Sequence, residues 1–134
     1  MNSFFLFNLF GVLGIFGEII FTSIIDSIKN KDPTLKGTSY LWMHPIYGMA
    51  GILINFLHTI FGSHFFLLRG ILYATYIMIG ELIAGIFLKK FIGKCPWHYT
   101  SKYSVLNVVR LDYFPIWFTA GLLIEKILLL VNSL

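Results

Sequence analysis

Four long apolar runs, separated by short polar stretches, set the pattern of this chain. They cover residues 4–25, 44–62, 67–88 and 114–131. An α-helix rises 1.5 Å per residue, so runs of about 20 residues match the roughly 30 Å of hydrocarbon in a bilayer. The pattern predicts an all-α, polytopic membrane protein with four transmembrane helices in a single domain, residues 1–134.

The polar stretches predict how these helices are connected. Residues 26–42 hold three lysines, Pro33 and Gly37 and are typical of a loop. Only Ser63–Phe66 separates the second run from the third, which predicts a tight antiparallel hairpin. In residues 95–113, the second part from Val105 to Asp112 has apolar residues on one side, but too few of them to cross the membrane. We therefore expect an interfacial or re-entrant segment before the last helix.

Composition supports the membrane class. The chain has 134 residues, of which 57% are hydrophobic and 12% are charged, whereas about a quarter of an average soluble domain is charged. The formal charge of +4 comes from lysines beside apolar runs, a pattern of membrane topology. We therefore expect the lipid bilayer, and no nucleic acid, as a partner.

The positive charges also predict an orientation. Eight lysines and arginines lie in the loops after the first and third runs, and Arg69 alone lies near the hairpin between the second and third. Under the positive-inside rule, the two long basic loops are cytoplasmic and both termini lie on the non-cytoplasmic side.

The four runs contain signs of an internal duplication. Pro45–Ile54 aligns with Pro115–Ile124, with the proline and an Ala-Gly pair in matching places. The first and third runs share a Gly-Glu pair, Gly17-Glu18 and Gly80-Glu81. These matches predict two tandem helix-loop-helix repeats, related by a parallel pseudo-twofold axis along the membrane normal.

Three acidic residues lie inside the apolar runs. Glu18, Glu81 and Glu125 are half of the six acidic residues in the chain. A carboxylate at the centre of a membrane helix costs about 2.5–3.5 kcal/mol on insertion scales, so such residues usually face protein, water or a substrate. We expect Glu18 and Glu81 to lie at matching depth and to pair as a site for an ion, a proton or a polar substrate. The alternative is a structural hydrogen-bonding role, which we favour for Glu125.

Polar and aromatic residues near these acids are candidates for a supporting role. They are His44, Tyr47, Trp97, His98, Tyr99, Arg110, Asp112 and Trp117. The sequence has no Glu-x-x-His, His-x-x-x-His or Cys-x-x-Cys motif, so we predict no metal and no cofactor. The single cysteine, Cys95, cannot form an intramolecular disulfide.

A set of motifs resembles a known family. The segment Cys95-Pro96-Trp97-His98-Tyr99-Thr100, followed by Leu111, Tyr113, Pro115, Trp117, Gly121 and Glu125, is similar to small membrane proteins described as putative ABC-transporter type IV and to the related transmembrane protein 229 group. Gly17-Glu18 and Pro45-Ile46-Tyr47-Gly48 resemble the earlier motifs of that family. The family usually has a Trp-Asp-Tyr-Ser pattern, where this chain has His98 and Thr100. The resemblance implies a permease-like membrane component.

Three functions are compatible with these observations. We expect a small transporter-like or permease-like component with no catalytic residues, present as a homodimer or in a larger membrane complex. The alternatives are a structural or assembly subunit of a larger complex and a lipid-modifying membrane enzyme. The sequence has no phosphate-binding loop, so any ATPase is expected to be a separate chain.

Overall fold

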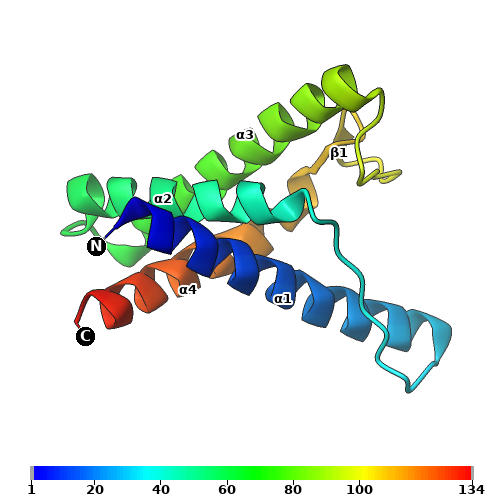
Figure 1. Cartoon of the computed structure of the whole chain (residues 1–134), viewed down its shortest axis with the longest axis horizontal. Helices are drawn as coiled ribbons and strands as arrows, with labels where there is room; N and C mark the ends of the chain where they lie inside the picture. The colour runs from blue at the N-terminus through cyan, green and yellow to red at the C-terminus, as the bar shows by residue number, and fades with distance from the viewer. Residues whose placement is uncertain (1, 134) are drawn as a thin grey trace. The chain divides into compact units, whose positions relative to one another are not determined.

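A computed structural model describes residues 2–133, and within them the fold is almost entirely helical. Its four α-helices are α1 (Ser3–Asn30), α2 (Met43–Phe61), α3 (Phe66–Ile92) and α4 (Phe114–Asn132) (Figure 1). Between α3 and α4 lie the two-residue strands β1 (Ser104–Val105) and β2 (Val109–Arg110) and the 3-10 helix η1 (Leu111–Tyr113). The all-α prediction is confirmed.

The helix boundaries follow from local chemistry. The Asn2 side chain accepts a hydrogen bond from the Phe4 amide at the start of α1, the usual role of an N-cap asparagine. Lys31 and Gly93 are the C-cap residues that follow α1 and α3, and both have positive φ (53° and 82°), as is common at helix C-termini. Pro115 lies in the first turn of α4, where no backbone donor is needed.

Three helical segments are long and apolar enough to cross a membrane. Within residues 2–133 they are Ser3–Asn30, Phe66–Ile92 and Leu111–Asn132. Helix α2 has 19 residues and carries His44, Asn55 and His58, which lower its apolar character. Its role as the fourth transmembrane helix stays a prediction.

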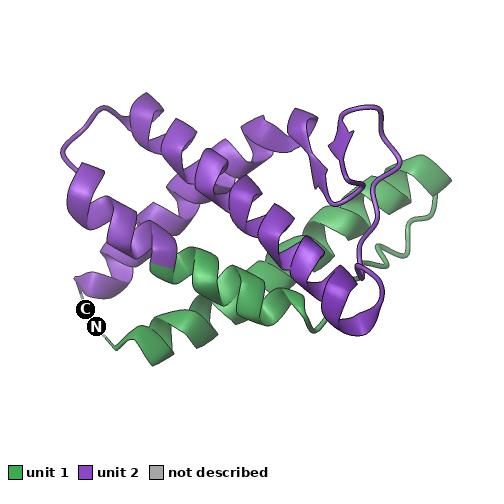
Figure 2. Cartoon of the chain, turned by 90° about the horizontal axis from the view of Figure 1, so that it is seen from above, with its two compact units in different colours: residues 1–52 green, residues 53–134 purple. Residues whose placement is uncertain are grey.

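The chain divides into two compact units, residues 1–52 and 53–134, which are coloured separately in Figure 2. In the first unit, α1 packs against the start of α2 through glycines. A Cβ atom on Gly14 would lie 2.2 Å from Cγ of Tyr47, and one on Gly51 would lie 2.4 Å from Cδ2 of Phe10. An aromatic ring of each helix therefore packs against a glycine of the other helix, so the two backbones can lie close together.

In the second unit, α3 and α4 also pack through contacts between glycines and aromatic rings. A Cβ atom on Gly121 would lie 2.5 Å from Cβ of Tyr73, and one on Gly70 would lie 2.3 Å from Cε2 of Phe118. A further glycine contact, between Gly85 and Val108, attaches the segment before α4 to α3.

That segment contains a small hairpin, and its interfacial or re-entrant placement stays a prediction. Residues 104–110 form an antiparallel hairpin in which Ser104 pairs with Arg110 and Val105 pairs with Val109, followed by η1. The hydrophobic pattern did not predict this hairpin, because its strands are only two residues long. The one-sided apolar pattern arises because Val108 and Val109 are buried against the protein.

Candidate functional site: buried carboxylates

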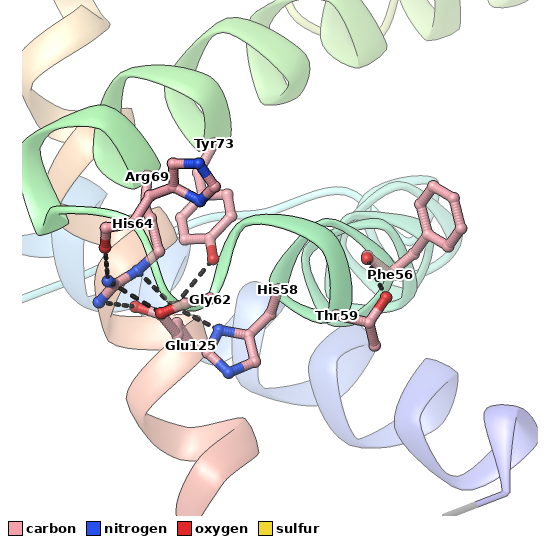
Figure 3. Close-up of polar contacts among 8 residues, drawn as sticks. All are labelled: Phe56, His58, Thr59, Gly62, His64, Arg69, Tyr73 and Glu125. Carbon is pink, nitrogen blue, oxygen red and sulfur yellow. Dashed lines mark hydrogen bonds and ion pairs between the residues drawn. The ribbon is translucent and has the colours of Figure 1, made fainter.

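An extensive polar network surrounds Glu125 in α4 (Figure 3). Its carboxylate is 1% exposed and accepts a hydrogen bond from the Tyr73 hydroxyl at 2.9 Å. His58 Nδ1 lies 2.6 Å from Oε1. Arg69 donates from Nη2 to Oε2 at 3.2 Å, and its Nε lies 2.8 Å from Oε1 as an ion pair without the angle of a hydrogen bond.

Three helices bring this network together. His58 comes from the end of α2, Arg69 and Tyr73 come from successive turns of α3, and Glu125 comes from the middle of α4. Arg69 also donates to the carbonyl oxygens of Gly62 and His64, in the connection between α2 and α3. The guanidinium thus joins that connection to α4.

The charges of this network balance. Arg69 supplies a permanent positive charge beside the Glu125 carboxylate, and the Tyr73 and His58 contacts take up further lone pairs of that carboxylate. A buried carboxylate satisfied in this way avoids the cost of an unpaired charge. This arrangement is suited to holding α2, α3 and α4 together.

A second carboxylate, Glu81, lies toward the other end of α3. It is 5% exposed and accepts a hydrogen bond from the Tyr99 hydroxyl at 3.2 Å. The Tyr99 amide donates to the Asn107 carbonyl at 2.9 Å, and Trp97 Nε1 donates to the Val108 carbonyl at 2.9 Å. The loop after α3 is therefore folded back so that its tyrosine reaches the acid.

The third carboxylate, Glu18 of α1, has a similar environment in the first unit. It is partly buried and accepts a hydrogen bond from the Ser39 hydroxyl at 2.7 Å. Tyr47, which packs on Gly14, also contributes a side-chain hydrogen bond to it. As at Glu81, the hydroxyl comes from the loop that follows the helix carrying the acid.

The other predicted residues have more varied surroundings. His44 packs edge-on against Phe7, with ring centroids 5.4 Å apart. Arg110 forms an ion pair with Asp112, whereas His98 is exposed. Among residues 2–133, the buried indole nitrogen of Trp117 has no hydrogen-bond partner.

The predicted pairing of Glu18 with Glu81 stays a prediction, because the two residues belong to different units. Sequence reasoning missed His58, Arg69 and Tyr73 as partners of Glu125. One signal was present: Arg69 and Tyr73 are four residues apart on α3, and so lie on one face of it. Within residues 2–133, no group of three or more His, Cys, Asp or Glu side chains could hold a metal ion.

Long apolar helices with carboxylates buried among them define this chain as a small helical membrane protein. More specifically, the chain belongs to the family described as Putative ABC-transporter type IV, whose model matches residues 5–133. The match confirms the family suggested by the sequence motifs. No solved structure matches the chain.

Proposed function

We propose that the chain is a permease-like membrane component of an ABC-type transport system, in which Glu18 and Glu81 bind a cation or a proton in transit. Membership of the family supports the first part of this proposal, the class of transport protein. The observation that carries the site is that each carboxylate accepts a hydrogen bond from a hydroxyl in the loop after its helix, Ser39 for Glu18 and Tyr99 for Glu81. A hydroxyl can exchange for water or a ligand at little electrostatic cost, whereas a paired guanidinium cannot.

The positions of the two acids support their equivalence. Glu18 follows the first residue of α1 by 15 residues, and Glu81 follows the first residue of α3 by 15 residues. The helices themselves match in length, with 28 and 27 residues for α1 and α3 and 19 residues each for α2 and α4. These matches favour the tandem repeat, and we propose that it places both acids at one depth in the bilayer.

The rest of the transport system follows from the size and sequence of the chain. Its four helices enclose little volume, so we propose a homodimer or a larger complex. The sequence has no phosphate-binding loop, so a separate chain would bind and hydrolyse ATP. We propose that the two lysine-rich loops face the cytoplasm, where such an ATPase would lie.

The test is ion flux in liposomes that contain the chain together with the complex that co-purifies with it, supplied with ATP. A pH-sensitive dye inside the vesicles reports proton movement, and sodium and potassium gradients provide the other probes. We expect flux above that of protein-free vesicles, and a large loss of it in the variants Glu18→Gln and Glu81→Gln. Asp26→Asn is the matched control, because Asp26 is an exposed acid on the same helix as Glu18 and its substitution should leave flux unchanged. Flux that is indistinguishable from empty vesicles, or identical in both glutamine variants and the wild type, would refute the site.

A second candidate is an assembly subunit that stabilises a larger membrane complex and transports nothing. The observation that favours it is the Glu125 network, in which side chains from α2 and α3 contact a carboxylate buried in α4. This candidate predicts no flux above that of protein-free vesicles. It also predicts that Glu18→Gln and Glu81→Gln leave recovery of the intact complex unchanged, whereas Glu125→Gln reduces it.

A further inference from the structure

The tip of the hairpin between β1 and β2 places a leucine in an unfavourable conformation. Leu106 and Asn107 have φ values of 52° and 58°, and the Val108 amide donates to the Val105 carbonyl across them at 3.0 Å. Two consecutive positive φ values in a hairpin are typical of a type I′ turn, for which Asn-Gly is the preferred pair. Leucine has no local hydrogen bond to offset the steric cost of this conformation.

Leu106 is also unfavourable in water. Its side chain is 61% exposed, so folding removes little of its apolar surface from solvent. Two further large side chains of the same segment, Tyr103 and Leu111, are exposed as well. Leu106 thus combines an unfavourable backbone conformation with an apolar side chain exposed to solvent. This combination indicates a contact with another molecule that the chain alone does not provide.

The hairpin holds this tip rigidly. The Trp97 indole donates to the Val108 carbonyl, the Tyr99 amide donates to the Asn107 carbonyl, and Val108 packs on Gly85 of α3. Gly85 lies seven residues, about two turns, before the last residue of α3. Leu106 is therefore presented from a fixed platform on the C-terminal half of an apolar helix.

The charges around the platform indicate what it contacts. Lys89 and Lys90 lie in the last turn of α3, Lys94 follows it, and Lys102 lies over the ring of Tyr103 at 5.0 Å from its centroid. Helix α3 is long and apolar enough to cross the bilayer, so its lysine-rich end lies at the membrane–water boundary. Lysines beside exposed apolar side chains are the combination that binds anionic lipid headgroups.

We propose that the 104–110 hairpin is a membrane anchor, with Leu106 inserted at the boundary between headgroups and acyl chains and the neighbouring lysines bound to lipid phosphates. The proposal of an anchor does not rest on the proposed transport function, since it does not require Glu18 or Glu81 to bind an ion. It would fix the loop that carries Tyr99 and thus limit the movement of that loop away from Glu81.

The first unit has a similar feature in its own loop. Leu35 has a φ of 53° and is 62% exposed, and Lys36 follows it. A second exposed leucine with a left-handed backbone beside a lysine supports the interpretation that such residues serve a lipid contact.

A fluorescent reporter beside Leu106 tests the proposal. Asn107→Cys, in a Cys95→Ser background, places a single nitrobenzoxadiazole label at an exposed position of the tip. The labelled full-length chain is placed in vesicles of phosphatidylcholine with phosphatidylglycerol, and quenching by doxyl-labelled lipid is compared with quenching by iodide in water. We expect strong doxyl quenching, a several-fold loss of it in Leu106→Asn, and retention in Leu106→Met.

The two variants separate insertion from folding. Asparagine tolerates the left-handed conformation, so Leu106→Asn is expected to keep the hairpin intact, and methionine keeps the apolar contact. Weaker doxyl quenching in vesicles of phosphatidylcholine alone supports the role of the lysines. Strong iodide quenching of the wild type, equal to that of Leu106→Asn, would place the tip in water and overturn the proposal. Protection from both quenchers would also overturn it, because it would show that a protein surface or a second copy covers the tip.

Discussion

Removing the charge of Glu125 is expected to destabilise the packing of α2, α3 and α4. The variant Glu125→Gln keeps the size of the side chain and one carbonyl oxygen for Tyr73, but it leaves the Arg69 guanidinium beside a neutral group. Breaking a buried ion pair by removing one partner typically costs about 3–5 kcal/mol. Since the Arg69 side chain is 19% exposed and also donates to two carbonyl oxygens, we expect the lower end, about 3 kcal/mol.

The assay is reversible unfolding in mixed micelles with increasing dodecyl sulfate, followed by circular dichroism. Asp26→Asn is the control, because an exposed acid should change the free energy of unfolding by no more than about 0.5 kcal/mol. Glu125→Ala should cost more than Glu125→Gln, because the buried Tyr73 hydroxyl then loses its acceptor, which adds about 1–3 kcal/mol.

A double variant separates charge pairing from packing. Arg69→Leu alone leaves the Glu125 carboxylate buried without its cation, and it should be at least as unstable as Glu125→Gln. Arg69→Leu with Glu125→Leu removes both charges and should recover most of the lost stability, since apolar replacement of a buried pair is often close to neutral. The reasoning fails if Glu125→Gln unfolds like the wild type, or if the double variant is no more stable than Arg69→Leu.

Two further predictions concern helix packing and the thiol. Gly14→Ala should lower the free energy of unfolding by about 1–3 kcal/mol, because its Cβ would overlap Tyr47. Gly17→Ala is the control: no described atom lies within 4 Å of a Cβ at that position, so this variant should be neutral or stabilising by up to about 1 kcal/mol. Equal effects of the two variants in the same unfolding assay would contradict this packing. Burial raises the pKa of the Cys95 thiol, so iodoacetamide should alkylate the folded chain more slowly than the unfolded chain near neutral pH. As the pH increases, the alkylation rate of the folded chain should keep rising after that of the unfolded chain has levelled off. Identical pH profiles for the two states would show that this thiol is open to water.

The helices could be predicted from the sequence because their signals are local. The apolar runs gave boundaries within a few residues of α1 to α4, and the prolines and glycines mark their ends. The family could also be predicted, because the residues around Trp97 and Pro115 form motifs that are read directly along the chain.

The contacts of the acids could not be predicted in the same way. His58 and Arg69 are 67 and 56 residues from Glu125 in the chain, and no periodicity within one helix links positions that far apart. In the sequence, Arg69 indicates membrane topology only, whereas in the fold its guanidinium contacts Glu125. The hairpin tip at Leu106 was missed for a different reason: leucine is a poor residue for a left-handed turn, so the sequence argued against a turn there.

The three acids illustrate why residue type and depth in an apolar run are insufficient to identify a functional site. All three are glutamates in long apolar helices, yet a guanidinium holds Glu125, whereas loop hydroxyls contact Glu18 and Glu81. Releasing Glu125 would leave Arg69 unpaired in the protein interior, so exchange of a ligand at that position carries a large electrostatic cost. Releasing a hydroxyl leaves only a neutral group that water can satisfy. Substitution of Glu125 is therefore expected to damage the fold first, and substitution of Glu18 or Glu81 is expected to damage binding first.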